Sequence, residues 1–520
     1  MSSMSAAVAC RGLMRISHRC AVSAPRRHCA SRPQAILSGR SFSATRPRLE
    51  TEREWSTPLA KQLFEAISTT GPVPLASYMR MCLTGDLAGY YTGAIGQHRD
   101  QFGVKGDFVT SPEISQMFGE LIAVWFIAEW ISQGQPKLGV QLIEVGPGRG
   151  TLMDDMLRTI KRFPAMSESI ESVFMVEASP ELQQKQRNLL CGSDTPSDGR
   201  EAECRSITRH LGKPIVWAES LRSIPVESNK VPFIVAHEFF DALPIHCFQS
   251  ALASASASSA KATSTSATTG KPPTTNKTPS PSYEWRELMV SPNHPAEAAS
   301  AQARAKTASK DAFPEEFQLV LSSKPTRHSR YLPESSTRYR NLKQSPGSVV
   351  EICPDASLYA ADFASRIGGS DKVKKPQPSG AALILDYGTS DTIPINSLRG
   401  IRHHKLVSPF SAPGLVDLSV DVDFTAIAEA ATLASEGVEV HGPVPQADFL
   451  ELMGIRERAE MLIKAAGTDK SAAESIKKSW KRLVDRGPNG MGKVYKALAI
   501  LPENDGQRRP VGFGGDLPSR

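Results

Sequence analysis

The stretch Gln141-Leu-Ile-Glu-Val-Gly-Pro-Gly-Arg-Gly-Thr151 contains a short apolar run, an acid and then three glycines at alternate positions. The next apolar residues recur at the spacing of one helix face, and they are Met153, Met156, Leu157 and Ile160. This order predicts a strand, a tight glycine turn and a helix. A nucleotide-binding α/β fold begins in this way, and its ligand lies beyond the carboxyl end of the strand.

The glycine spacing narrows the choice of ligand. A dinucleotide turn needs a glycine where this chain has Thr151, and the Lys of a phosphate loop is absent. The pattern fits the first motif of S-adenosylmethionine (SAM)-dependent methyltransferases of the seven-strand class. Glycines at Gly146, Gly148 and Gly150 would let the backbone close on the amino-acid tail of SAM, and Glu144 could accept from its ammonium group or order a water. Alternatively, a glycine turn of this kind can serve only to pack a strand against a helix, with no ligand.

A second acid supports the cofactor interpretation. Ser172-Val-Phe-Met-Val-Glu177 predicts a strand that ends in a carboxylate. At this place in nucleotide-binding α/β folds, an acid accepts from both ribose hydroxyls, because adjacent O–H donors need a two-oxygen acceptor. The alternative is a surface acid that begins the helix at Ser179-Pro180. An NAD-linked oxidoreductase stays open as another class, although Thr151 disfavours it.

Candidate catalytic residues follow a further buried strand, Val231-Pro-Phe-Ile-Val-Ala236. Glu238 and Asp241 come directly after it and would place two carboxylates near a nucleophile. We interpret His237 as a packing or hydrogen-bonding residue rather than a base. Another buried strand, Ala381-Ala-Leu-Ile-Leu-Asp386, is expected to end at the same edge.

A loop before the glycine turn supplies a third carboxylate. The loop Gly106 to Glu113 precedes a helix with one apolar face, so it could close over the ligand. Ser111 is expected to be the N-cap and Pro112 the first helical residue. Glu113 is a catalytic candidate, and its alternative role is to favour the positive end of the helix dipole.

No metal site is predicted. The five cysteines after residue 49 show no C-x-x-C pair and no zinc-like histidine spacing. Asp417, Asp421 and Asp423 could in principle bind a cation. The alternating apolar residues between them instead predict a strand with these acids on its solvent face.

The remaining chain is divided by composition. Residues 56–131 are predicted to be a mainly helical region, residues 138–502 the α/β core, and residues 503–520 a tail. Residues 250–282 are mostly Ser, Ala, Thr, Lys and Pro and predict a disordered insert, and residues 368–380 a polar linker. No apolar run is long enough to span a membrane.

The first 49 residues contain nine arginines, no lysine and no acid, which is typical of a mitochondrial targeting segment. Arg40-Ser-Phe-Ser43 resembles a matrix-peptidase site, so we expect residues 1–42 to be a transit peptide. A basic arm that binds nucleic acid is the alternative. Without the nine arginines of the first 49 residues, the formal charge changes from +7 to −2 for residues 50–520, so the basic charge gives no support for a nucleic-acid partner.

Five motifs together resemble the MidA family over about residues 72–502. They lie at residues 106–120, 144–152, 236–244, 385–388 and 412–424. The insert, the linker and the loop at 191–210 depart from the family pattern outside these motifs. The resemblance implies a Rossmann-like core of the seven-strand SAM-dependent class and a mitochondrial matrix enzyme that symmetrically dimethylates an arginine in a subunit of respiratory complex I, as an assembly factor. The alternative is a SAM-binding assembly scaffold that does not catalyse transfer. Target arginine and oligomeric state stay open.

Overall fold

The computed structural model describes most of the unit that runs from Glu54 to Arg520. The described residues are 54–86, 88–93, 103, 106–191, 205–253, 282–294 and 313–514. The expected transit peptide, residues 254–281 of the expected insert and residues 192–204 of the polar loop lie outside them, as do the last six residues of the expected tail.

A nine-stranded sheet forms the centre of the fold, with the order β16-β17-β11-β6-β2-β3-β5-β4 and β15 beside β11. The strands are β2 (Val140–Val145), β3 (Ile170–Val176), β4 (Arg205–Ile207), β5 (Pro214–Ala218), β6 (Val231–His237), β11 (Ala381–Thr389), β15 (Val422–Asp423), β16 (Val438–Pro445) and β17 (Tyr495–Pro502). The five strands from β5 to β11 run parallel, and β17 runs antiparallel to both neighbours. The sheet therefore has the expected α/β character but more strands than the predicted seven.

Chain order changes direction between β2 and β6. From β2 the chain adds β3 and then β5 on one side, and it later returns to add β6 and then β11 on the other. In open parallel sheets a ligand binds at such a switch point, outside the carboxyl ends of the strands. The topology thus places a binding site next to the glycine turn that follows β2.

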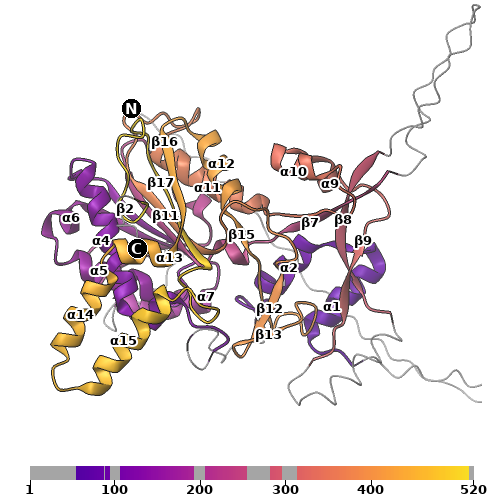
Figure 1. Cartoon of the computed structure of the whole chain (residues 1–520), viewed down its shortest axis with the longest axis horizontal. Helices are drawn as coiled ribbons and strands as arrows, with labels where there is room; N and C mark the ends of the chain where they lie inside the picture. The colour runs from indigo at the N-terminus through magenta and orange to yellow at the C-terminus, as the bar shows by residue number, and fades with distance from the viewer. Residues whose placement is uncertain are drawn as a thin grey trace, which may run out of the picture. The chain divides into compact units, whose positions relative to one another are not determined.

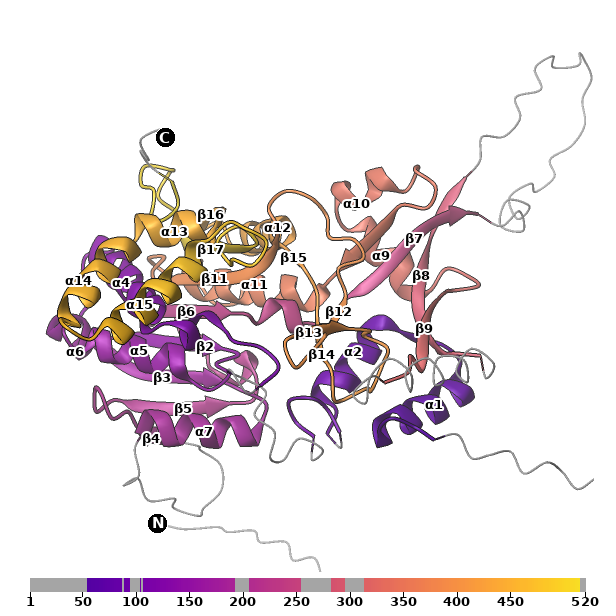
Figure 2. The same ribbon diagram turned by 60° about the horizontal axis from the view of Figure 1, so that its bottom comes forward.

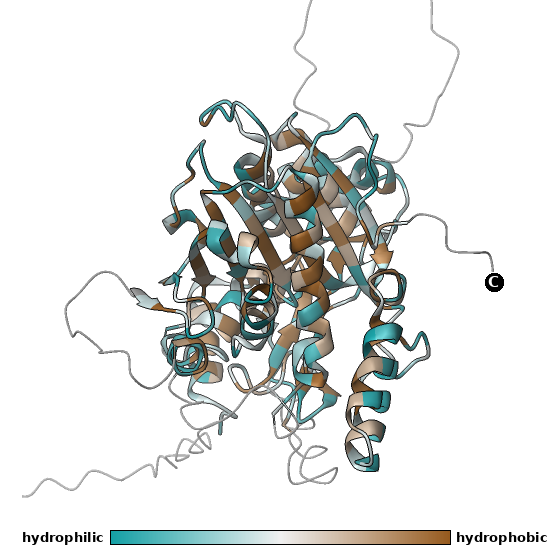
Figure 3. Cartoon of the chain, turned by 90° about the vertical axis from the view of Figure 1, so that its left-hand side faces the viewer, coloured by the Kyte–Doolittle hydropathy of each residue, from teal (hydrophilic) through white to brown (hydrophobic). Residues whose placement is uncertain are grey.

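Both faces of the sheet are covered by helices. Along β2, Val140 and Leu142 belong to one apolar cluster, whereas Ile143 and Val145 belong to the other, as the alternation of a strand requires. The first face is covered by α4 (Gln116–Ser132), α5 (Thr151–Ile160), α6 (Pro164–Ser169), α7 (Pro180–Cys191), α13 (Gln446–Leu452), α14 (Ile455–Ala465) and α15 (Lys470–Val484). The second is covered by α11 (Pro354–Gly368) and α12 (Phe424–Ala434). Figure 3 shows hydrophobic residues gathered on the central strands.

Smaller sheets form an accessory region beside this core (Figures 1 and 2). One sheet has the order β1-β8-β7-β10 with β9 on β8, and a three-stranded sheet has the order β13-β12-β14. Their strands are β1 (Val73–Pro74), β7 (His246–Leu252), β8 (Tyr283–Pro292), β9 (Phe317–Leu321), β10 (Val349–Ile352), β12 (Arg399–Arg402), β13 (Lys405–Val407) and β14 (Asp417–Ser419). Helices α1 (Pro58–Thr70), α2 (Leu75–Thr84), α9 (Arg327–Tyr331) and α10 (Thr337–Leu342) complete the region. The apolar sides of α1 and α2 pack with these strands in one cluster.

Two local predictions are wrong. The helix expected to begin at Ser111 is divided into α3 (Ser111–Ile114) and α4, because Ser115 is extended and caps α4 with its side chain. Ser111 lies inside α3, and Thr110 is the N-cap residue. The single strand expected through the three aspartates is divided between β14 and β15 in different sheets, and Asp417 is buried rather than solvent-facing.

Region boundaries also differ in detail. Helix α4, expected within the N-terminal helical region, packs on the main sheet. Residues 250–252 of the expected insert form the end of β7. Among the described helices, none combines the length and the apolar character that crossing a membrane requires.

Candidate active site

A cavity of about 870 Å³ lies at the carboxyl ends of the central parallel strands. The loops after β2, β3 and β6 line it together with Tyr387 of β11, and so do accessory residues from α2, β12 and β14. We call the part lined by Glu144, Gly146, Gly148 and Glu177 the glycine end. We call the part lined by Glu238, Asp241, Tyr387, Arg399 and Asp417 the acid end.

The glycine turn has the backbone that its sequence predicts. All three glycines have positive φ, with +70° at Gly146, +52° at Gly148 and +84° at Gly150. A Cβ atom added at Gly146 would lie 2.6 Å from Phe239 Cδ2, so a side chain there would have to displace that ring. Gly146 and Gly148 line the cavity, whereas Gly150 does not; it is the N-cap of α5 and packs near Gln186.

Glu144 lies buried at the end of β2 and lines the cavity. Burial raises the pKa of its carboxyl to about 8, although the backbone N–H of Met153 opposes the shift. Its Oε2 atom has no hydrogen-bond partner among the described residues. A buried oxygen without a donor is costly, so this position suits a ligand that brings its own N–H or O–H groups.

Glu177 is held in place by a network that reaches the glycine turn. Its Oε1 accepts from the Ser179 backbone N–H at 2.8 Å, and its Oε2 accepts from Gln186 Nε2 at 3.3 Å. Gln186 Nε2 also donates to Gly148 O at 2.7 Å, and Gln186 Oε1 accepts from Trp217 Nε1 at 2.8 Å. Burial raises the pKa of the Glu177 carboxyl to about 7 against these bonds. Gln186 therefore fixes the acid and the turn relative to each other.

At the acid end, Glu238 follows β6 with a strained backbone, since its φ is +48°. Its side chain is 12% exposed, and Oε1 has no hydrogen-bond partner among the described residues. Burial raises the pKa of this carboxyl well above its usual value, and the charge of Asp241 raises it further. His237 Nε2 lies 3.3 Å from that oxygen, but burial lowers the pKa of the imidazole to about 3, so the ring is neutral.

Asp241 shares this environment. Its Oδ2 accepts from the Tyr387 hydroxyl, which also contacts the Ser419 hydroxyl, while Oδ1 has no partner among the described residues. Burial raises the pKa of the Asp241 carboxyl, and the Tyr387 hydrogen bond and the Arg399 charge oppose that shift. Two carboxyl oxygens, one each from Glu238 and Asp241, are thus buried in the cavity wall and accept no hydrogen bond from the part of the chain that the structure describes.

Asp386 explains how the loop after β6 is held. Its Oδ2 accepts the backbone N–H groups of Phe239, Phe240 and Asp241 at 3.1, 2.8 and 3.3 Å. Its Oδ1 accepts the N–H of Tyr387 at 2.8 Å, and the residue is fully buried. This acid within β11 is therefore a positioning residue for the turn that carries Glu238.

Glu113, the third catalytic candidate, lies nearer the glycine turn. Its Oε1 is 3.2 Å from Arg149 Nη1, and both residues line the cavity. The structure thus brings every candidate residue to the cavity except Gly150.

Sequence reasoning missed the accessory contribution to the acid end. Tyr91 donates to Asp417 Oδ1 at 2.9 Å, and Arg399 Nη1 donates to Asp421 Oδ1 at 2.7 Å. The Arg399 guanidinium also lies 4.6 Å from the centroid of the Tyr387 ring. Alternation around the aspartates indicated only a strand, because no local pattern shows that β12 and β14 reach the core.

The residues at the glycine end fit SAM. The close approach at Gly146 leaves no room for a side chain, Glu177 offers a two-oxygen acceptor for ribose hydroxyls, and Glu144 has a buried oxygen to receive a donor. A cationic ligand group at the acid end would offset the burial of Glu238 and Asp241.

Comparison with known proteins agrees with this geometry. A sequence model of the family described as "Putative S-adenosyl-L-methionine-dependent methyltransferase" matches residues 121–444. "Protein arginine methyltransferase NDUFAF7, mitochondrial" of Rattus norvegicus is 32% identical over 94% of this chain and 94% of its own length. The protein of that name from Homo sapiens is 32% identical over 90% and 88%.

A solved structure shares the fold. The crystal structure of a protein from Burkholderia thailandensis bound to S-adenosyl-homocysteine has a TM-score of 0.58 at 20% identity, and it covers 88% of this chain and 93% of that one. The family match spans more than half of this sequence, and the relatives cover nearly all of it. The resemblance predicted from the motifs is confirmed: this chain belongs to the MidA family of SAM-dependent methyltransferases.

Proposed function

We propose that this protein is a mitochondrial protein arginine N-methyltransferase with SAM as methyl donor. Glu238 Oε1 and Asp241 Oδ1 carry the proposal, because both are buried carboxyl oxygens with no hydrogen-bond donor among the described residues and both residues line the same cavity as the SAM-type turn. A guanidinium group offers five N–H donors and a permanent positive charge, which are what these oxygens lack. The names of the relatives, which describe protein arginine methyltransferases, support the same substrate class.

The two acids would prepare the guanidinium for attack. Bound SAM supplies an electrophilic methyl group and leaves as S-adenosylhomocysteine. Arginine stays protonated at any working pH, since its pKa exceeds about 12. A carboxylate pair would fix the planar group and draw positive charge towards the non-reacting nitrogens. The nitrogen that gains the methyl group must lose one proton, and Glu238 or Asp241 would accept it. Glu238 is the first choice, with Asp241 and Glu113 second.

The raised pKa values are consistent with an acid end made for a cation. Without a substrate, burial favours the protonated form of Glu238. An arriving guanidinium favours the ionised form, so substrate binding and carboxylate ionisation would be coupled. Proximity and charge alignment would then supply most of the rate.

Finer assignments rest on the family resemblance. We propose a core of the seven-strand class I type, to which β4 and β15 are additions. We also propose a matrix location, with residues 1–42 as the transit peptide, and a symmetric dimethylarginine product (type II activity) in a subunit of complex I, needed for assembly of that complex. The relatives' names support a mitochondrial location.

The test uses the chain from Ser43 onward, labelled SAM and a complex I subcomplex from cells that lack this protein. A Gly148→Val variant is the control, because Gly148 has a φ of +52° that a β-branched residue does not readily adopt. We expect label on one subunit with the wild type only, and acid hydrolysis of that subunit should yield symmetric dimethylarginine.

Two outcomes would contradict parts of the proposal. Asymmetric dimethylarginine would keep the enzyme but reject the type II assignment. If neither protein transfers label while both bind the subcomplex, the protein is a scaffold rather than a methyltransferase.

A further inference from the structure

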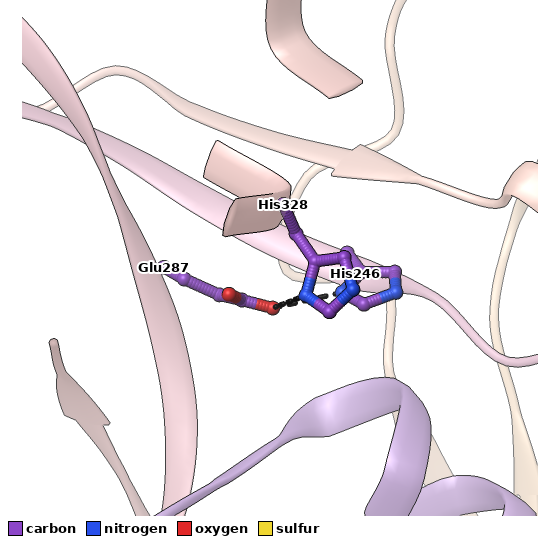
Figure 4. A group of neighbouring side chains, drawn as sticks. All are labelled: His246, Glu287 and His328. Atoms are coloured by element: carbon purple, nitrogen blue, oxygen red, sulfur yellow. Dashed lines mark hydrogen bonds and ion pairs between the residues drawn. The ribbon is translucent and has the colours of Figure 1, made fainter. Parts of the chain in front are cut away.

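Three side chains of metal-ligand type meet in the accessory region. His246 lies at the start of β7, Glu287 in β8 and His328 in α9, and their ligand atoms are all within 4.8 Å of one another. Figure 4 shows both imidazole rings next to the Glu287 carboxylate. None of the three lines the active-site cavity, so the cluster needs its own explanation.

Both rings direct the same kind of nitrogen at one oxygen. His246 Nδ1 lies 2.8 Å from Glu287 Oε1, and His328 Nδ1 lies 3.6 Å from it. Two ligands bound at about 2.0–2.1 Å to a tetrahedral zinc ion are roughly 3.3 Å apart. The observed separations fall on either side of that distance, so small rotations of the rings would admit an ion.

The two rings are also placed so that they can contact the same ion. Their centroids are 4.3 Å apart. A bound ion would accept a lone pair from the Nδ1 atom of each ring. It also supplies positive charge to Glu287, whose side chain is 0% exposed.

The surroundings hold the carboxylate and leave an entry path. The Thr326 hydroxyl donates to Glu287 Oε2, which fixes the second oxygen as outer-shell partners of metal ligands usually do. His328 is 44% exposed, so an ion and a water ligand can reach the cluster from solvent.

The chain connectivity gives an ion a structural purpose. The connection from β7 to β8 spans residues 253–282, and the one from β8 to β9 spans residues 293–316. Closing long connections costs entropy that grows with their length. A single ion would join β7, β8 and α9, which these connections separate along the chain.

We propose that His246, Glu287 and His328 bind a divalent transition-metal ion of the zinc type, with water completing its coordination, and that the ion fixes α9 to the β7–β8 pair. Two imidazoles and one carboxylate form a ligand set that zinc accepts. Magnesium prefers octahedral oxygen ligands and should not bind.

The experiment measures zinc bound to the full chain after chelation, incubation with zinc chloride and dialysis. The variants are Glu287→Gln, which keeps the shape of the side chain, and the half-exposed His328→Ala. His441→Ala is the matched control, because His441 Nε2 pairs with Glu439 Oε1 at 3.0 Å and no third metal-ligating side chain joins them among the described residues. A thermal melt with zinc or magnesium chloride gives the second readout.

We expect about one zinc ion per chain in the wild type and in His441→Ala. Both cluster variants should bind zinc about 10-fold more weakly or worse. Zinc, but not magnesium, should raise the melting temperature of the wild type and leave that of His328→Ala unchanged. If the wild type retains no zinc, or if His328→Ala and Glu287→Gln retain as much as the wild type, the proposal is overturned and the cluster is only hydrogen-bonded.

Discussion

At the glycine end of the cavity, Glu177 accepts hydrogen bonds at both carboxylate oxygens, whereas at the acid end Glu238 Oε1 and Asp241 Oδ1 accept none among the described residues. The glycine end is built by neighbouring stretches of chain, and Gln186 ties its parts together. The acid end gathers residues from the core and from the accessory β12 and β14. The glycine end is therefore largely organised, with only Glu144 Oε2 lacking a hydrogen bond from the described residues, whereas the acid end leaves one carboxyl oxygen of Glu238 and one of Asp241 for a ligand to pair.

The largest effect should come from the acid end. We expect Glu238→Gln to lower the rate of methyl transfer about 100- to 1000-fold, because the neutral amide cannot polarise a guanidinium or accept its proton. Affinity for S-adenosylhomocysteine should stay unchanged, since the glycine end is intact. Transfer rates and calorimetric binding constants measure the two effects. Glu219→Gln, the same change at an exposed position of the cavity lining, is the control. A Glu238→Gln enzyme with normal transfer would remove Glu238 from this role.

A change at the glycine end should instead weaken cofactor binding. We expect Gly146→Ala to reduce affinity for S-adenosylhomocysteine about 10- to 100-fold, because φ is +70° and a Cβ would strike Phe239. Gly134→Ala is a matched control, since Gly134 also has positive φ but has open space around its Cβ position. If Gly146→Ala binds S-adenosylhomocysteine as tightly as Gly134→Ala, the close approach at Gly146 is not needed for cofactor binding.

The pH dependence of cofactor binding tests whether the glycine end works in its ionised form. Folding raises the pKa of Glu144 to about 8 and that of Glu177 to about 7, from a value of 4.5 in the unfolded chain. Protonation of these two carboxyls therefore stabilises the folded protein fully at a pH below 4.5, and this contribution is lost as the pH rises through 7 to 8. A ligand that prefers the carboxylates must displace those protons.

Affinity for S-adenosylhomocysteine should therefore rise with pH, by at most about 10-fold per unit for each proton released, and level off near pH 8. Calorimetry in buffers of different ionisation enthalpy should detect the released protons. In Glu177→Gln the rise below pH 7 should flatten. A wild-type affinity that is constant from pH 6 to 8 would contradict this interpretation.

The smallest effect is expected at Tyr387, which positions Asp241. Tyr387→Phe removes a hydrogen bond that lowers the pKa of Asp241, so that pKa should rise. The acid limb of the transfer rate should then move to higher pH, with a loss of roughly several-fold at neutral pH. A purely structural role would lower the rate without moving the pH profile. Transfer rates measured across pH, with cofactor affinity as the control, separate these cases.

The contrast between the ends also explains which parts of the site the sequence could predict. Glu144, the glycines and Glu177 lie on two successive strand–turn units, and local periodicity identifies such units. Glu238 and Asp241 were found because they follow a buried strand. Arg399 and Tyr91 could not be assigned to the cavity, because only the tertiary packing of the accessory region brings them there.

For the fold as well, the sequence predicts local elements but not contacts between distant parts of the chain. Buried strands such as β2, β6 and β11 were predicted because they are short apolar runs that end in acids. Pairing between strands far apart in the chain, such as β17 between β11 and β16, leaves no local pattern. The three aspartates show a real ambiguity. Their alternation is that of one strand, but Asp417 lies in β14 of one sheet and Asp423 in β15 of another. Asp423 is also the N-cap residue of α12.

The backbone of Glu238 has a consequence for how this protein can vary. A residue that is not glycine, with φ of +48° and a largely buried carboxyl, lowers the stability of the fold at that position. Glycine there would relieve both penalties and remove the proposed clamp. A selection for heat resistance alone should thus enrich for inactive proteins at this position, and retention of Glu238 under such a selection would itself require selection for activity.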